Sequence, residues 1–268
     1  MIIDSHVHVW TDDLQRYPIA QGHTVAEMAP PTFTPEELLA HCQPSGVERI
    51  VLVQMSFYGT DNSYMLEAMR RYPGVFGGIA VVDEAGDGVE AEMERLAELG
   101  VKGCRLQPQG GSFEGYARMF ARAAKSGQAM CCLMTPDTLP ALDRMCDAYP
   151  QTPVVIDHLC RIGVSGTIEE GEVAALCALA RHEQVRVKVS AFYALGQKRP
   201  PHEELLPLIE RVYEAFGARR LMWASDCPYQ VQSETYEDGL ALVRDKMAWK
   251  SEEDREWVLG RTAEGMFF

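Results

Sequence analysis

The chain has 268 residues and a formal net charge of −14, from 39 acidic residues against 25 lysines and arginines. An acidic chain is poorly suited to binding a phosphate backbone, so we expect no nucleic-acid partner. A hydrophobic content of 47% with 24% charged residues is typical of a folded globular protein. No run approaches the roughly 20 apolar residues that span a bilayer, and the first residues lack a signal-peptide pattern. We therefore expect a cytoplasmic protein without a membrane partner.

Short apolar, β-branched runs alternate with longer amphipathic segments along the whole chain. Eight of these runs have the length and composition of strands. They are Ile2–His8, Arg49–Gln54, Val75–Val82, Val101–Leu106, Ala129–Met134, Pro153–Asp157, Val185–Ser190 and Arg220–Ser225.

The segments between these runs show the 3.6-residue period of amphipathic helices, and capping signals mark their ends. Thr34–Glu37 predicts a helix start with a capping box, Asp61 predicts another start, and Gly100 and Gly217 predict helix ends. Strands and helices that alternate in this way predict a (β/α)8 TIM barrel, an α/β fold, as a single domain over residues 1–268. A doubly wound open sheet is the alternative, but no Gly-x-Gly-x-x-Gly motif follows any strand.

The eight cysteines include no Cys-x-x-Cys pair, and most fall within apolar strand or helix patterns. Such cysteines pack as small hydrophobic residues, so we expect free thiols in a reducing compartment.

In a barrel enzyme the chemistry lies at the carboxyl ends of the strands. The first strand ends in His6 and His8, which strand alternation predicts to project the same way, with Ile3, Val7 and Val9 on the other face. Two imidazoles at a barrel mouth can hold a metal ion or polarise an oxygen. Two incidental histidines are the alternative interpretation.

Two further strands end in ionisable side chains. His158 follows the apolar run of the sixth strand, where it is either a hydrogen-bonded core residue or a ligand or acid–base group. Asp226 ends the eighth strand just before Pro228 and is either a turn residue or the base that deprotonates a hydrolytic water. Arg105 lies in the apolar fourth strand and needs an anionic partner, which a salt bridge or a substrate carboxylate would supply equally well.

The order of these residues resembles that of the amidohydrolase superfamily. The resembling stretches are Ile3–Trp10, Val53–Asn62, Asp157–Arg161, Val187–Tyr193, Ala224–Pro228 and Gly260–Phe267. The resemblance covers nearly the whole chain and is greatest to the lactonase-type amidohydrolase-2 branch, which includes 2-pyrone-4,6-dicarboxylate lactonase and the sugar-acid lactonases. It implies the barrel fold and a hydrolase.

The resemblance also implies a reaction, the opening of a small lactone (a cyclic ester) by an activated water. In that reaction Asp226 takes a proton from the water that attacks the ring carbonyl. His6, His8 or His158 polarises the carbonyl and stabilises the developing oxyanion.

The substrate is expected to be a small lactone or carboxylate. Two arginines would anchor a carboxylate or hydroxyl group, and three tyrosines would form pocket walls. These five residues are Arg105, Arg161, Tyr58, Tyr193 and Tyr229.

Three imidazoles and one carboxylate at the predicted rim could hold a single divalent ion, Zn²⁺ or Mn²⁺. These ligands would be His6, His8, His158 and Asp226. Metal-bound relatives typically add a histidine at the end of the fifth strand or a bridging lysine on the fourth. Here the fifth strand, Ala129–Met134, has no histidine and the fourth offers Arg105. This difference favours activity without an essential metal.

Two alternatives to a lactonase stay open from the sequence. One is a metal-dependent decarboxylase or another amidohydrolase-type hydrolase, and the other is a non-catalytic binder of small molecules on a degenerate barrel. The sequence does not indicate an oligomeric state.

Overall fold

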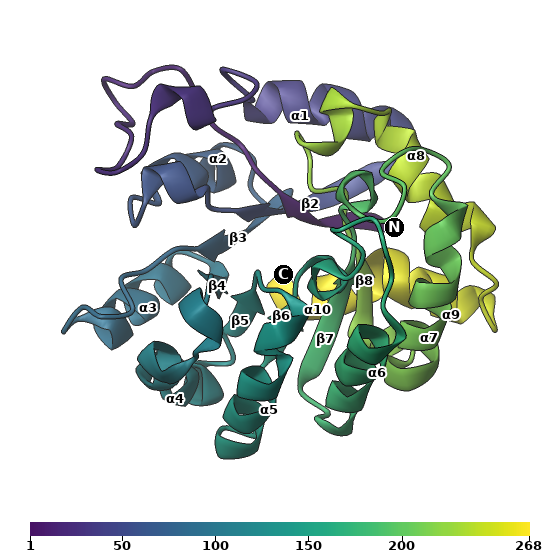
Figure 1. The fold of residues 1–268 in the computed structure, drawn as a ribbon. Coiled ribbons are helices and arrows are strands. Elements are labelled where there is room, and N and C mark those ends of the chain that lie inside the picture. Colours follow the sequence, from purple (N-terminus) through teal and green to yellow (C-terminus); the bar gives the residue numbers. More distant parts are fainter.

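A computed structural model describes residues 1–268, with the side chain of Gln109 left out. Eight parallel strands form one sheet in the order β1 to β8, with helices around its outside (Figure 1). The strands are β1 (Ile2–Val7), β2 (Val47–Val53), β3 (Phe76–Ala80), β4 (Val101–Leu106), β5 (Ala129–Cys132), β6 (Val154–Ile156), β7 (Val185–Val189) and β8 (Leu221–Trp223). Each predicted strand is confirmed, and most end one or two residues earlier than expected.

The sheet closes where β1 meets the segment after β8. His8 N donates to Cys227 O at 2.9 Å, and Asp226 N donates to His6 O at 3.0 Å. These bonds make the fold a (β/α)8 barrel and exclude the open sheet.

The helices confirm the capping predictions at most positions. Thr34 caps the first helix with a capping box, and Gly217 follows the seventh. The second helix is preceded by Asn62, while the Asp61 carboxylate accepts from Ser63 N at 3.0 Å. The helices are α1 (Pro35–Cys42), α2 (Ser63–Arg71), α3 (Val89–Glu98), α4 (Ala117–Ser126), α5 (Leu139–Ala148), α6 (Glu170–Ala178), α7 (Leu206–Phe216), α8 (Tyr236–Ala241), α9 (Glu252–Glu256) and α10 (Thr262–Phe267).

The hydrophobic core has two parts. The larger part lies between the barrel and its outer helices and includes the inward faces of α3 and α7. The smaller part fills the barrel interior and is closed by two residues of α10. Its members are Ile3, Val51, Val53, Ile79, Ala129, Cys131, Val155, Met222, Ala263 and Phe267. All eight cysteines are free thiols, and seven of them are buried, as predicted.

Strand β1 departs from simple alternation. Its pairing with β2 shifts register between Asp4 and Val7. Val7 packs in the outer core, as predicted, but Ile3 packs inside the barrel, so the prediction that it lies on the face of Val7 is wrong. The physical reason is the irregularity, which changes the face that the following side chains occupy.

A buried carboxylate lies at the β1–β8 closure. Asp4 has no exposed surface, and it accepts hydrogen bonds from Ser225 N at 2.9 Å and from Tyr236 Oη at 2.6 Å. Burial raises the pKa of Asp4 to about 6, against the lowering effect of these hydrogen bonds. The closure therefore depends on a group that titrates in a weakly acidic range.

This pKa predicts a pH dependence of stability. Since the carboxyl group ionises near pH 4 when unfolded and near pH 6 when folded, its contribution to stability is present below pH 4 and is lost as the pH rises through 6. A shift of roughly 2 units corresponds to roughly 3 kcal/mol. Urea unfolding from pH 4 to 7 should show the wild type losing up to that amount relative to Asp4→Asn. The exposed control Asp12→Asn should run parallel to the wild type, and a parallel curve for Asp4→Asn would contradict the prediction.

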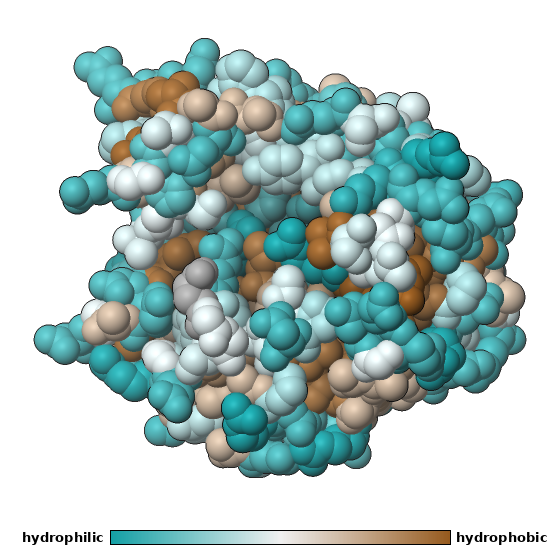
Figure 2. All heavy atoms as spheres, viewed as in Figure 1, coloured by the Kyte–Doolittle hydropathy of each residue, from teal (hydrophilic) through white to brown (hydrophobic). Residues whose placement is uncertain are grey.

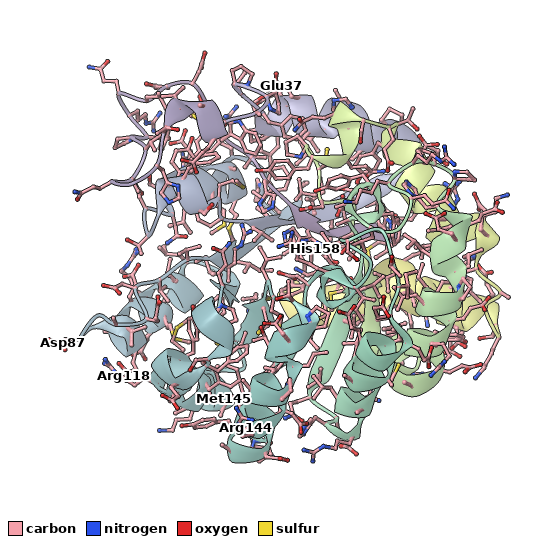
Figure 3. The ribbon with its side chains drawn as sticks, in the orientation of Figure 1. Glu37, Asp87, Arg118, Arg144, Met145 and His158 are labelled. Carbon is pink, nitrogen blue, oxygen red and sulfur yellow. The ribbon has the colours of Figure 1, made fainter. Side chains whose placement is uncertain are left out.

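The face of the barrel seen in Figure 1 is hollowed near its centre, and hydrophilic residues lie in the hollow (Figure 2). Figure 3 places His158 near this centre, whereas Asp87, Arg118 and Arg144 lie at the periphery. In the described part of the chain, no helix combines the length and the apolar character needed to cross a membrane.

Candidate active site

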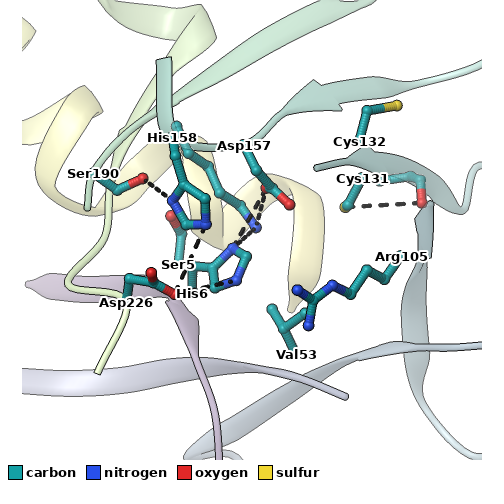
Figure 4. Close-up of polar contacts among 12 residues, drawn as sticks. Ser5, His6, Val53, Arg105, Cys131, Cys132, Asp157, His158, Ser190 and Asp226 are labelled. Atoms are coloured by element: carbon teal, nitrogen blue, oxygen red, sulfur yellow. Dashed lines mark hydrogen bonds and ion pairs between the residues drawn. The ribbon is translucent and has the colours of Figure 1, made fainter. Parts of the chain in front are cut away.

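Three imidazoles converge on one carboxylate oxygen at the barrel mouth, and Figure 4 shows two of them, His6 and His158, beside Asp226. The Nε2 atoms of His8, His6 and His158 lie 3.3, 3.6 and 3.8 Å from Asp226 Oδ1. The Tyr193 hydroxyl donates to the other oxygen, Asp226 Oδ2, at 2.6 Å. The structure thus brings together four side chains predicted as catalytic and one predicted as a pocket wall.

The backbone at two of these positions is left-handed. Asp226 has φ of 65°, a conformation that Asp tolerates better than most residues. Residues 158–161 form a left-handed turn with φ of 54°, 51°, 57° and 58°. The turn directs His158 and Arg161 to one cavity, while Leu159 and Cys160 are buried. Because each such residue costs roughly 1 kcal/mol, the packing of Leu159 and Cys160 and backbone hydrogen bonds such as Cys160 N to Asp157 O (3.0 Å) must stabilise the turn.

Each imidazole has a different partner on its Nδ1 atom. His8 Nδ1 donates to Val53 O at 2.7 Å. His158 Nδ1 lies 2.8 Å from Ser190 Oγ, and His6 Nδ1 lies 3.1 Å from Lys188 Nζ. These contacts fix the orientation of all three rings relative to Asp226.

Lys188 and Asp157 were not identified from the sequence as site residues. Both are fully buried, and Lys188 Nζ lies 3.0 Å from Asp157 Oδ1. A signal was present in the sequence, because a lysine inside the apolar run Val185–Val189 requires an acidic partner.

Electrostatics keep the central carboxylate ionised. Burial alone would raise the pKa of Asp226, but the neighbouring imidazoles outweigh it and hold that pKa well below its usual range. Burial lowers the pKa of His6, helped by the positive charge of Lys188, and burial also lowers the pKa of His158. The site therefore combines an ionised carboxylate with two imidazoles, His6 and His158, whose lowered pKa favours the neutral form.

A cavity of about 250 Å³ opens above this cluster. Its volume lies below the 300–1,000 Å³ of drug-sized sites, so it suits a small ring. His8, His158 and Asp226 line it, whereas the fully buried His6 lies behind them. The other lining residues are Arg105, Leu133, Arg161, Ala191, Tyr193, Ala194, Leu195 and Tyr229.

Arg105 also lines a second cavity, of about 280 Å³. Arg105 Nη1 donates to Gln54 O at 2.9 Å, which holds its guanidinium between the two cavities. A larger cavity of about 670 Å³, near the amino ends of β3 and β4, contains none of the predicted site residues.

Tyr58 is not brought to the site cavity. Its hydroxyl exchanges hydrogen bonds with the backbone of Thr11, at 3.2 Å from Thr11 N and 3.3 Å from Thr11 O. Tyr58 is buried and fixes the segment after β1, and it is not among the residues that line the cavity of about 250 Å³, where it was predicted as a pocket wall. The contact with Thr11, 47 residues away, was not visible in the sequence.

Ligand atoms of His6, His8 and Asp226 lie within 4.8 Å of one another and are of the types that zinc prefers. His8 is suited to be a metal ligand. Its Nδ1–H donates to Val53 O, so the neutral ring has a lone pair on Nε2. His6 is not suited to be a metal ligand through Nε2. Its Nδ1 accepts from Lys188 Nζ, so the proton of the neutral ring is on Nε2 and no lone pair is left there. As arranged, the cluster does not fit a metal held by all three residues.

A parallel barrel with a polar cluster at the carboxyl ends of its strands has the architecture of a barrel enzyme. The Amidohydro_2 family model, described as amidohydrolase, matches residues 3–268. The chain therefore belongs to the amidohydrolase family, as its sequence pattern predicted, and it is a hydrolase.

Relatives with described activities support this assignment. The chain is 30% identical over 207 residues to the L-fucono-1,5-lactonase of Burkholderia ambifaria, covering 73% of this chain and 70% of that protein. It is 27% identical over 259 residues to the 2-pyrone-4,6-dicarboxylate hydrolase of Comamonas testosteroni, covering 90% and 81%. The crystal structure of a 2-pyrone-4,6-dicarboxylic acid hydrolase homologue from Pseudomonas putida superposes with a TM-score of 0.82, at 26% identity, covering 99% and 97%.

Proposed function

We propose that this protein hydrolyses a small lactone that carries a carboxylate or a similar polar group. The observation that supports this most is the convergence of three imidazoles on Asp226 at a cavity that also holds two arginines. The lactone-hydrolysing relatives support the same reaction class. We further infer that residues 1–268 act as one domain.

In the proposed mechanism, Asp226 orients a water beside the ring carbonyl and accepts its proton as the water attacks. The ionised state of Asp226 is secured by its neighbours, and Tyr193 holds the oxygen that does not face the imidazoles. The tetrahedral intermediate then collapses with cleavage of the ring C–O bond. The ring oxygen leaves as a hydroxyl after taking the proton that Asp226 had accepted, so the base is regenerated.

The imidazoles that line the cavity stabilise the oxyanion. The Ser190 hydroxyl can donate to His158 Nδ1, which places the ring proton on Nε2, facing the cavity. His8, whose ring is held by the Nδ1–H bond to Val53 O, lines the cavity beside His158. His6 lies behind Asp226 and acts on that carboxylate rather than on the substrate.

The two cavity arginines select the substrate class. A guanidinium binds a carboxylate through paired, charge-assisted hydrogen bonds. Arg105 lies across the cavity from Asp226 (Figure 4), while Arg161 is exposed at the mouth. A ring held by these arginines places its carbonyl group near the base.

A panel of lactones tests this function. Purified protein is mixed with sugar lactones and with carboxylated and sulfonated unsaturated lactones, and proton release is followed with a pH indicator. We expect hydrolysis of at least one member, and a rate about 10³-fold lower for Asp226→Asn. Release of carbon dioxide from a carboxylated substrate would show a decarboxylase, and saturable binding without turnover would show a binding protein; either result would replace the proposal.

A further inference from the structure

A buried cation lies directly behind the proposed active site. Lys188, on β7, has no exposed surface, and its ammonium group is 3.0 Å from Asp157 Oδ1 and 5.8 Å from the Phe267 ring centre, inside the barrel. Its remaining polar contact is to His6 Nδ1, at 3.1 Å. Few lysines are buried so completely, and this one has no contact with the cavity that would hold the substrate.

The contact between Lys188 and His6 determines where the ring proton lies. An ammonium group has protons to donate and no lone pair, so His6 Nδ1 must accept. Asp157 Oδ1, 3.4 Å from the same nitrogen, would favour a proton on Nδ1, but the ammonium is closer. The neutral ring therefore carries its proton on Nε2.

That proton points at the proposed base. His6 Nε2 is buried, has no hydrogen-bond partner among the described residues, and lies 3.6 Å from Asp226 Oδ1. With the proton on Nε2, the ring presents a positive edge to the carboxylate. With the proton on Nδ1, it would present a lone pair to the same oxygen and repel it.

We propose that Lys188 is a positioning residue that holds His6 in the Nε2–H tautomer and thereby keeps the Asp226 carboxylate aligned for proton transfer. The chain of contacts runs from Lys188 through His6 to Asp226, with Asp157 neutralising the cation. This inference rests on the proposed function for its effect on the rate, but the tautomer can be measured without any substrate.

Nuclear magnetic resonance of ¹⁵N-labelled protein tests the tautomer directly. Two-bond proton–nitrogen correlations report which nitrogen of each imidazole is protonated, and the signals missing from His6→Gln identify His6. In the wild type we expect His6 to be protonated on Nε2 and not on Nδ1. In Lys188→Met, where Asp157 is the remaining polar neighbour of Nδ1, we expect the proton to move to Nδ1.

Kinetics test the consequence. On a lactone that the wild type hydrolyses, we expect Lys188→Met to lower kcat by about 100-fold with little change in KM, a smaller loss than the roughly 10⁴-fold caused by a wrong tautomer of a histidine that transfers the proton itself. Lys102→Met, an exposed lysine on β4, is the matched control and should leave both constants unchanged.

Several outcomes would overturn the inference. They are a wild-type His6 protonated on Nδ1, a tautomer unchanged in folded Lys188→Met, and an unchanged kcat in that variant. If Lys188→Met does not fold, the wild-type spectrum still decides the tautomer. A protein with the expected tautomer that hydrolyses no lactone would refute the proposed function and leave the assignment of His6 intact.

Discussion

Replacement of Asp226 by Asn is expected to lower kcat by about 10³-fold, within the range of about 10²–10⁴ for loss of a general base. The amide is nearly isosteric with the carboxylate, and its oxygen can still accept the Tyr193 hydroxyl, which donates to Asp226 Oδ2 at 2.6 Å. It cannot accept the proton of the attacking water. Initial rates on the lactone identified by the panel measure the effect.

A control variant distinguishes the effect of the Asp226 carboxylate from the effect of the hydrogen bond that positions it. Tyr193→Phe removes the hydrogen bond to Asp226 but leaves the carboxylate, so kcat should fall less than in Asp226→Asn. Circular dichroism and thermal unfolding should show that both variants stay folded. Wild-type turnover by folded Asp226→Asn would remove this residue from the mechanism.

Replacement of Arg105 by Met is expected to raise KM for a carboxylated lactone by about 10- to 100-fold. A hydrogen bond to a charged group contributes about 1.5–3 kcal/mol, and about 1.4 kcal/mol corresponds to a factor of ten in affinity. In the proposed mode of binding the guanidinium contacts the substrate at a distance from the reacting bond, so kcat should change much less. The measurement is a comparison of KM between a carboxylated lactone and an uncharged lactone of similar size.

The uncharged lactone is the internal control, because it gains nothing from the guanidinium. Arg118→Met, on the outer helix α4 (Figure 3), is the matched control for loss of an arginine and should alter neither KM. An equal rise in KM for both lactones would mean that Arg105 is structural and acts through its bond to Gln54 O.

Much of the fold was determined by local sequence. The eight strands, the capping box at Thr34 and the helix end at Gly217 were all predicted correctly, because strand and helix periods and capping preferences depend on neighbouring residues alone. The barrel rule then placed His6, His8, His158 and Asp226 at one rim without knowledge of any contact.

Other features depended on long-range packing. On β1, Ile3 lies inside the barrel and not on the predicted outer face, because the strand has a register irregularity that the sequence does not reveal. Tyr58 was predicted as a pocket wall, but its hydroxyl bonds to the backbone of Thr11.

The partner of each site residue was likewise decided by tertiary structure. The sequence showed a lysine in an apolar strand but not that barrel closure would bring it within 3.1 Å of His6, 182 residues away. Asp4 meets Tyr236 across 232 residues for the same reason. Periodicity reports which side of a strand a residue occupies, whereas proton positions and ionisation depend on groups that only the closed barrel brings into contact.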